Sequence, residues 1–168
     1  MGQPPLDDET RALLTLSFVS GMGATKLGKL LEHFDSAVAC LAASDESLHR
    51  AGLSSRLVVA VMRAREDGIP ADEEERLRAP GLSFLRRGDE AYPVLLNHIY
   101  DPPPLLYVKG ALRADEFTIA IVGSRWADAA ALRATLELAE GMAREGFTVV
   151  SGLAQGVDTQ AHLGALAG

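Results

Sequence analysis

The sequence has a single cysteine, fewer basic than acidic residues, and no long apolar run. Cys40 has no partner for an internal disulfide, and its apolar neighbours predict a buried thiol in a reducing compartment. The 16 Lys and Arg residues against 23 Asp and Glu residues leave a formal charge of −7. This balance excludes a polycationic coat for nucleic acid, but it is compatible with a local phosphate site.

Signals for membrane insertion and secretion are missing as well. The longest uncharged stretch, residues 12–25, has only 14 residues and includes Ser, Thr and Gly, so it is too short and too polar to cross a bilayer. Residues 1–10 are polar and acidic, where a secretory signal would be basic and then apolar. We therefore expect a soluble cytoplasmic protein. Its 168 residues suffice for one domain or two small ones.

The motifs of several enzyme classes are also absent. No G-x-G-x-x-G follows Val122, and the chain has no Walker sequence G-x-x-x-x-G-K-[ST], which disfavours a dinucleotide enzyme and a P-loop ATPase. Neither Ser124 nor Ser151 lies in a G-x-S-x-G turn, and Asp158 and His162 have no third metal ligand at a suitable spacing. We predict no catalytic residue, no metal and no cofactor.

Residues 6–78 show the apolar spacing of helices interrupted by short breakers. An offset of 31 residues superposes Gly21 on Gly52, Leu27 on Val58, Leu30 on Val61 and Leu31 on Met62. This pattern predicts a duplicated helix–hairpin–helix unit in a domain spanning residues 1–78. The amides that begin the second helix, with Lys26 and Lys29, are candidates for a phosphate contact, and plain helix packing is the alternative.

A charged run and Ala79-Pro80-Gly81 close this part, so we place a second domain at residues 79–168. It opens with an extension, residues 82–116, in which residues 82–85 and 105–108 read as strands and three prolines precede the second strand. Lys109, at the end of this strand, is a candidate phosphate contact or an ordinary surface lysine.

Residues 117–168 have a β-α-β-α pattern. Thr118–Val122 is a continuous apolar run that predicts a central parallel strand covered on both faces, and residues 147–150 predict its partner. A helix ending near Gly146 joins them, and residues 157–167 form a second helix. The fold class is therefore α/β, a Rossmann-like parallel sheet that is incomplete at its C-terminal side and preceded by a small helical domain.

Two glycine-containing loops follow the two strands and should converge, because ligands bind beyond the carboxyl ends of parallel strands. Backbone N–H groups there can approach an anion, and Arg125 can add a bidentate contact unless it pairs with Asp128. Trp126, the only Trp, either stacks on a base or packs under the loop. His162, one helical turn after Asp158, either pairs with it, lines the pocket, or packs within the helix.

Residues 92–166 resemble the DNA-processing protein A (DprA/Smf) family. The motifs that carry the resemblance are Tyr92-Pro93, Asp101-Pro102-Pro103, Leu106-Tyr107, Lys109-Gly110, the run from Ile119 to Arg125, the run from Val149 to Ala154, Gly156, Asp158, Ala161-His162 and Gly164-Ala165-Leu166. The helical part also fits, since this family often begins with a SAM-like or helix–hairpin–helix domain.

The resemblance implies binding of single-stranded DNA that enters a naturally transformable bacterium, protection of that DNA, and loading of the RecA recombinase onto it. It also implies a homodimer in the intact protein and no enzymatic activity. Residue by residue, it assigns part of the strand-binding pocket to Gly123, Ser124, Arg125, Ser151, Gly152, Leu153, Ala154 and Gly156.

The sequence departs from the family pattern in two places. After Arg125 the family usually continues with Pro, Ser or Thr, and Tyr-Gly, whereas this chain has Trp126-Ala127-Asp128. It also stops at Gly168, inside the expected sheet, which suggests a fragment. The alternative function is a Rossmann-like nucleotide phosphoribohydrolase of the lysine-decarboxylase-like LOG group, and a third is a partner-binding scaffold.

Overall fold

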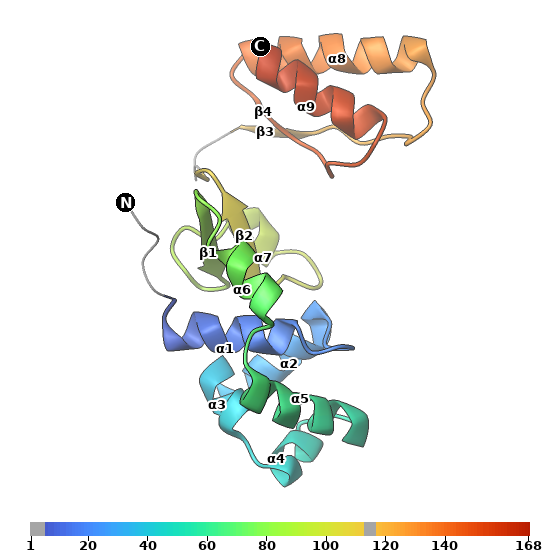
Figure 1. Cartoon of the computed structure of the whole chain (residues 1–168). Helices are drawn as coiled ribbons and strands as arrows, with labels where there is room; N and C mark the ends of the chain where they lie inside the picture. The colour runs from blue at the N-terminus through green and yellow to red at the C-terminus, as the bar shows by residue number, and fades with distance from the viewer. Residues whose placement is uncertain (1–5, 113–116) are drawn as a thin grey trace. The chain divides into compact units, whose positions relative to one another are not determined.

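The computed structural model describes residues 6–112 and 117–168, and each of these two ranges forms a compact unit (Figure 1). The first unit contains α1 (Asp8–Ser17), α2 (Ala24–Phe34), α3 (Ala37–Ala42), α4 (Asp45–Arg50), α5 (Ser55–Asp67), α6 (Ala71–Leu77), β1 (Leu82–Arg86), α7 (Val94–Asn97) and β2 (Leu105–Lys109). The second contains β3 (Thr118–Ala120), α8 (Ala129–Arg144), β4 (Thr148–Val150) and α9 (Val157–Ala167). The chain is thus a mixed α/β protein with a helical N-terminal region.

The turns and the helix starts of the predicted 31-residue repeat recur in the first unit. Gly21 and Gly52 both lie in turns between helices and both have positive φ, 88° and 90°. Such a backbone conformation favours glycine because it has no Cβ. The helices that follow begin at Ala24 and Ser55, which are again 31 residues apart.

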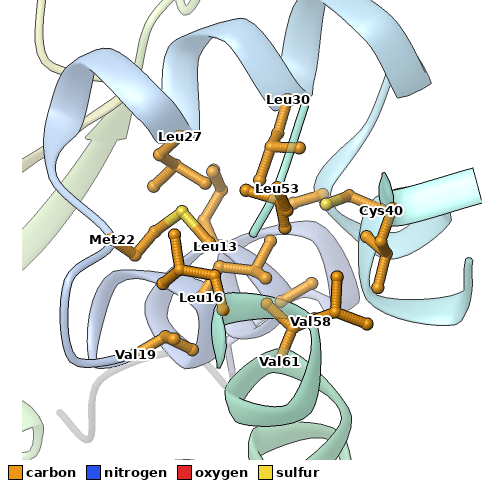
Figure 2. Packing of buried hydrophobic residues seen from close by; sticks show 14 residues of the cluster. Leu13, Leu16, Val19, Met22, Leu27, Leu30, Cys40, Leu53, Val58 and Val61 are labelled. Atoms are coloured by element: carbon orange, nitrogen blue, oxygen red, sulfur yellow. The ribbon is translucent and has the colours of Figure 1, made fainter. Parts of the chain in front are cut away.

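Both copies of the repeat direct their apolar side chains into one core. Figure 2 shows Leu13 and Leu16 of α1 gathered with Leu27 and Leu30 of α2 and with Val58 and Val61 of α5. A spacing of three residues places two side chains on the same face of a helix, which explains why each helix contributes such a pair. This core is the packing expected from the helical spacing of residues 6–78.

Cys40 lies in this core and is fully buried, as its apolar neighbours predicted. Burial raises the pKa of the Cys40 thiol to about 11, because a thiolate is poorly solvated among apolar side chains. The nucleophilic form of the thiol is therefore scarce at neutral pH.

We expect Cys40 in the folded chain to react with a disulfide reagent such as dithionitrobenzoate at least ~100-fold more slowly than in the urea-unfolded chain at pH 8. The raised pKa keeps the thiol protonated until the pH approaches 11, and the surrounding core excludes the reagent. Absorbance of the released thiolate measures the rate. Equal rates in the two states would contradict a buried Cys40.

The antiparallel pair of β1 and β2 packs against the helical part of the first unit. The strands are antiparallel, with Leu82 opposite Lys109 and Arg86 opposite Leu105, which confirms strands at 82–85 and 105–108. Phe84 and Leu105 pack against a small buried cluster of Leu14, Ile69 and Leu77. This strand pair therefore shares a buried cluster with the helices.

The sequence places these two strands in the predicted second domain, residues 79–168. The boundary between residues 78 and 79 stays a prediction. Residues 1–5 and 113–116 lie outside the described residues. The start of the predicted domain 1–78 and the end of the predicted extension 82–116 fall there.

The second unit is built on one parallel strand pair. Thr118, Ile119 and Ala120 of β3 are in register with Thr148, Val149 and Val150 of β4, and α8 connects the two strands. The predicted β-α-β-α order is confirmed, although β3 ends at Ala120, two residues earlier than expected.

Within the second unit, α8 and α9 cover one face of the strand pair, and coverage of the other face stays a prediction. Figure 1 shows α8 and α9 on the same side of β3 and β4. Val122, just after β3, is 77% exposed, and Val150 is 49% exposed. An apolar run indicates that a strand is suited to burial, but it does not say which neighbours cover it.

The two helices of this unit pack closely because glycines face the contact. A Cβ added at Gly164 would overlap the Leu136 carbonyl oxygen and would lie 2.9 Å from the Ala139 Cβ. Ala139 and Ala161 are fully buried between α8 and α9. Small side chains thus allow the two backbones to approach and hold α9 in place behind the loop that follows β4.

Candidate nucleic-acid interface

Two loops follow the two parallel strands at the same edge of the sheet. We call residues 123–126 and 151–156 the paired loops. The Ser151 hydroxyl donates a hydrogen bond of 2.7 Å to the Ile121 carbonyl oxygen, and the Val157 amide donates one of 3.1 Å to the Ser124 carbonyl oxygen. The two loops therefore meet, as their positions after parallel strands predicted.

Two glycines make the contact between the loops possible. A Cβ on Gly156, whose φ is 81°, would lie 2.7 Å from the Arg125 carbonyl oxygen. A Cβ on Gly123 would lie 2.8 Å from the Val157 Cγ2 atom. Real Cβ atoms do not come this close to other atoms. These glycines therefore serve the approach of one loop to the other, a reason that the sequence pattern did not indicate.

Asp158, in the first turn of α9, ties down the loop after β4. Its side chain is buried, with 7% exposed, and its Oδ2 atom accepts hydrogen bonds from the Gly152 amide at 3.1 Å and the Ala154 amide at 3.4 Å. No hydrogen bond or ion pair joins Asp158 to His162 in the part of the chain that the structure describes. Asp158 thus acts on the loop, and the predicted pairing with His162 is not found there.

This arrangement changes how an anion could be held. The sequence suggested that backbone N–H groups of both loops would face an anion. In the structure the amides of Gly152 and Ala154 donate to Asp158, and the amide of Trp126 donates to the Ser124 Oγ atom at 3.0 Å. These three amides already have acceptors within the chain, so the charged side chain in the loops is the remaining candidate for an anion contact.

That side chain belongs to Arg125, which is exposed. Within residues 6–112 and 117–168, its guanidinium group has no ion pair and no hydrogen bond. Asp128, its candidate partner, instead accepts a 2.8 Å hydrogen bond from the Ala131 amide and caps the start of α8. Trp126 beside it is 87% exposed, so its ring does not pack under the loop.

Of the other candidate contact residues, His162 has a buried ring nitrogen, and Lys109 and Lys26 belong to the first unit. The His162 Nε2 atom is buried without a hydrogen-bond partner among the described residues. Lys109 is exposed at the end of β2 in the first unit, and its phosphate contact stays a prediction.

Lys26 lies in α2 of the first unit, where its Nζ atom donates a 3.0 Å hydrogen bond to the Gly21 carbonyl oxygen. The neighbouring Thr25 hydroxyl donates to the Asp101 carboxylate, so a negative charge already lies at the start of α2. The phosphate contact at this helix stays a prediction.

Sequence reasoning missed the role of Asp158 in holding the loop. An acidic residue in the first turn of a helix that follows a glycine-rich loop is the available signal, because such a carboxylate can accept amide hydrogen bonds.

Among the described residues no three His, Cys, Asp or Glu side chains are placed to hold a metal ion. None of the described helices is both long and apolar enough to span a bilayer.

Comparisons with known proteins relate the chain to DNA-processing proteins. Protein Smf of Synechocystis is 32% identical over 155 residues, covering 89% of this chain and 39% of the relative. The DNA processing protein DprA of Streptococcus pneumoniae is 39% identical over 94 residues, covering 55% of this chain and 32% of the relative. The chain therefore spans well under half the length of these two relatives.

A solved structure has the same fold. The X-ray structure of DNA processing protein A from Streptococcus pneumoniae matches with a TM-score of 0.64 and 24% identity, over 96% of this chain and 54% of that one. The family model described as DNA recombination-mediator protein A matches residues 83–168. This match covers half of the sequence and includes both paired loops, so the chain belongs to the DNA recombination-mediator protein A family, whose members are named DprA or Smf.

Proposed function

We propose that this chain binds single-stranded DNA at the paired loops and takes part in recombination as a mediator. The observation that carries the proposal is the exposed Arg125 guanidinium, which has no partner in the described residues and lies where two strand-end loops meet. A guanidinium group can bind a phosphate through two parallel hydrogen bonds. The names of the relatives, which describe DNA processing, support the same ligand.

The surroundings of Arg125 favour an unpaired strand over a duplex. Trp126 and Leu153 are 87% and 82% exposed and offer apolar surface to bases that are not buried in a double helix. The paired loops present no helix or strand aligned to read base edges in a groove, so little sequence preference is expected. Gly123, Ser124, Ser151, Gly152, Ala154 and Gly156 shape the interface through their backbone contacts.

The wider role follows from family membership. We propose that the protein protects incoming DNA during natural transformation, loads the RecA recombinase onto it, and works as a homodimer without enzymatic activity. We also propose that the second unit is part of a Rossmann-like sheet, and that the repeated helical unit is a SAM-like or helix–hairpin–helix domain. The β-α-β-α order of the second unit and the paired glycine turns at residues 21 and 52 support these assignments.

Competition binding tests the preference for single strands. A fluorescent oligothymidine is bound to the chain and displaced by unlabelled single-stranded or duplex oligonucleotides of matched length and sequence. We expect the single strand to compete at least ~10-fold better than the duplex, because only unpaired bases expose their faces to Trp126 and Leu153.

Equal or better competition by the duplex would contradict the proposal. Release of ribose 5-phosphate from nucleoside monophosphates would instead favour the phosphoribohydrolase function.

A further inference from the structure

Leu153 combines an unfavourable backbone conformation with an exposed apolar side chain. Its φ is 57°, in the left-handed region, where the Cβ of a leucine crowds the neighbouring carbonyl oxygen. Its side chain is nevertheless 82% exposed, so it gains little from packing within this chain. Residues held in this way are concentrated at sites where the strain serves binding.

Asp158 holds Leu153 in this conformation. The Asp158 Oδ2 atom accepts hydrogen bonds from Gly152 and Ala154, the residues on either side of Leu153. The Thr159 hydroxyl adds a 2.7 Å hydrogen bond to the Ala154 carbonyl oxygen. The first turn of α9 therefore clamps the loop on both sides of Leu153 and directs its side chain to the surface.

Exposure alone does not distinguish Leu153, because single exposed leucines are common on proteins. Leu166 of α9 is 85% exposed, yet it lies in regular helix, and no carboxylate clamps the residues on either side of it among the described residues. Leu153 differs because its backbone is strained, its neighbours are held by a buried carboxylate, and its loop meets the loop that carries Arg125.

We propose that Leu153 is an apolar contact for an unpaired nucleobase, held ready by Asp158 as a positioning residue. The proposal rests on the proposed single-strand binding and divides the interface by chemistry. The Arg125 guanidinium contacts phosphate, whereas the Leu153 side chain contacts the face of a base or inserts between two bases. An aliphatic side chain can make such contacts with any of the four bases, as apolar wedges do in other DNA-binding proteins.

The test compares two strands of equal length and charge. One is an oligothymidine, and the other carries abasic tetrahydrofuran residues on the same phosphate backbone. We expect Leu153→Ala to weaken binding of the oligothymidine about 10-fold, because less apolar surface is buried against a base, and to leave binding of the abasic strand unchanged. Leu166→Ala removes an equally exposed leucine from the same unit, and it should change neither affinity.

Two further variants test the role of Asp158. Asp158→Ala removes the clamp and should reproduce the base-dependent loss of Leu153→Ala. Asp158→Asn keeps a carbonyl oxygen that can accept both amide hydrogen bonds, and it should restore most of the affinity. Circular dichroism confirms that each variant is folded; if Asp158→Ala does not fold, the comparison of Leu153→Ala with Leu166→Ala decides alone.

The outcomes separate this inference from the proposed function. An equal loss on both strands for Leu153→Ala, or no loss on the oligothymidine, overturns the base contact while single-strand binding stands. If Arg125→Ala binds both strands as well as the unchanged chain, Arg125 is not the phosphate contact, although a base-specific loss for Leu153→Ala still supports Leu153. If the unchanged chain binds neither strand, both proposals fail together.

Discussion

The Arg125→Glu protein is expected to bind single-stranded DNA more than ~100-fold more weakly than the unchanged chain, because it lacks the guanidinium group and repels a phosphate. Neutralising the same side chain in Arg125→Ala should weaken binding about 10- to 100-fold. It should also flatten the salt dependence of the affinity by a slope of about 0.7 for each phosphate that the variant no longer binds. Fluorescence anisotropy titrations at several salt concentrations measure both effects.

Arg144→Ala is the matched control for this experiment. Arg144 is also exposed and belongs to the same unit, but it lies at the end of α8 and pairs with Glu140. The paired loops lie near the start of α8, so removing a charge from its far end should leave DNA affinity nearly unchanged, and exposed pairs of this kind contribute little to stability. A folded Arg125→Glu protein with full affinity would remove Arg125 from the interface, whereas equal losses for both arginines would indicate a diffuse charge effect.

The second large effect is expected at Gly164, where α9 meets α8. In Gly164→Ala the new methyl group would overlap the Leu136 carbonyl oxygen and approach the Glu140 amide nitrogen at 3.1 Å. The helices can relieve this overlap only by moving apart, since the atoms in the way are two backbone atoms and the Ala139 Cβ, which no side-chain rotation can move. We expect a loss of about 3 kcal/mol in the free energy of unfolding, the upper part of the range for overpacked sites.

Gly141→Ala provides the control within the partner helix. Nothing lies within 4 Å of a Cβ added at Gly141, so this substitution should leave the free energy of unfolding unchanged or raise it by about 0.5–1 kcal/mol through higher helix propensity. Urea unfolding followed by circular dichroism compares the two variants. A Gly164→Ala protein as stable as Gly141→Ala would show that the close approach of α8 and α9 is not required.

Both predictions concern the proposed interface at the paired loops, through two different physical effects. In the proposed interface Arg125 contributes charge directly, whereas Gly164 would act through the position of α9, whose Asp158 holds the loop after β4. A partial loss of DNA affinity in Gly164→Ala would therefore resemble the loss in Asp158→Ala, with a stronger effect on base-containing than on abasic strands.

Much of the fold was predictable because its signals are local. The repeat in the first unit rests on helical spacing and on Gly21 and Gly52, whose positive φ values are a property of the turns themselves. The β-α-β-α order rests on the apolar runs at Thr118 and Phe147 and on the helix between them. The meeting of the paired loops follows from the parallel direction of the strands, which a helical connection imposes.

By itself, the sequence determined the helical repeat, the buried Cys40, the order of the elements in residues 117–168, and the motifs that place the chain in its family. Only the tertiary structure decided that β1 and β2 pack with the helices, that α8 and α9 lie on the same side of β3 and β4 (Figure 1), and that Asp158 binds the amides of Gly152 and Ala154. The physical reason is the separation along the chain between the residues that interact. Helix spacing and turn geometry are set by residues a few positions apart, whereas burial and hydrogen-bond partners depend on which distant segments arrive at the same place.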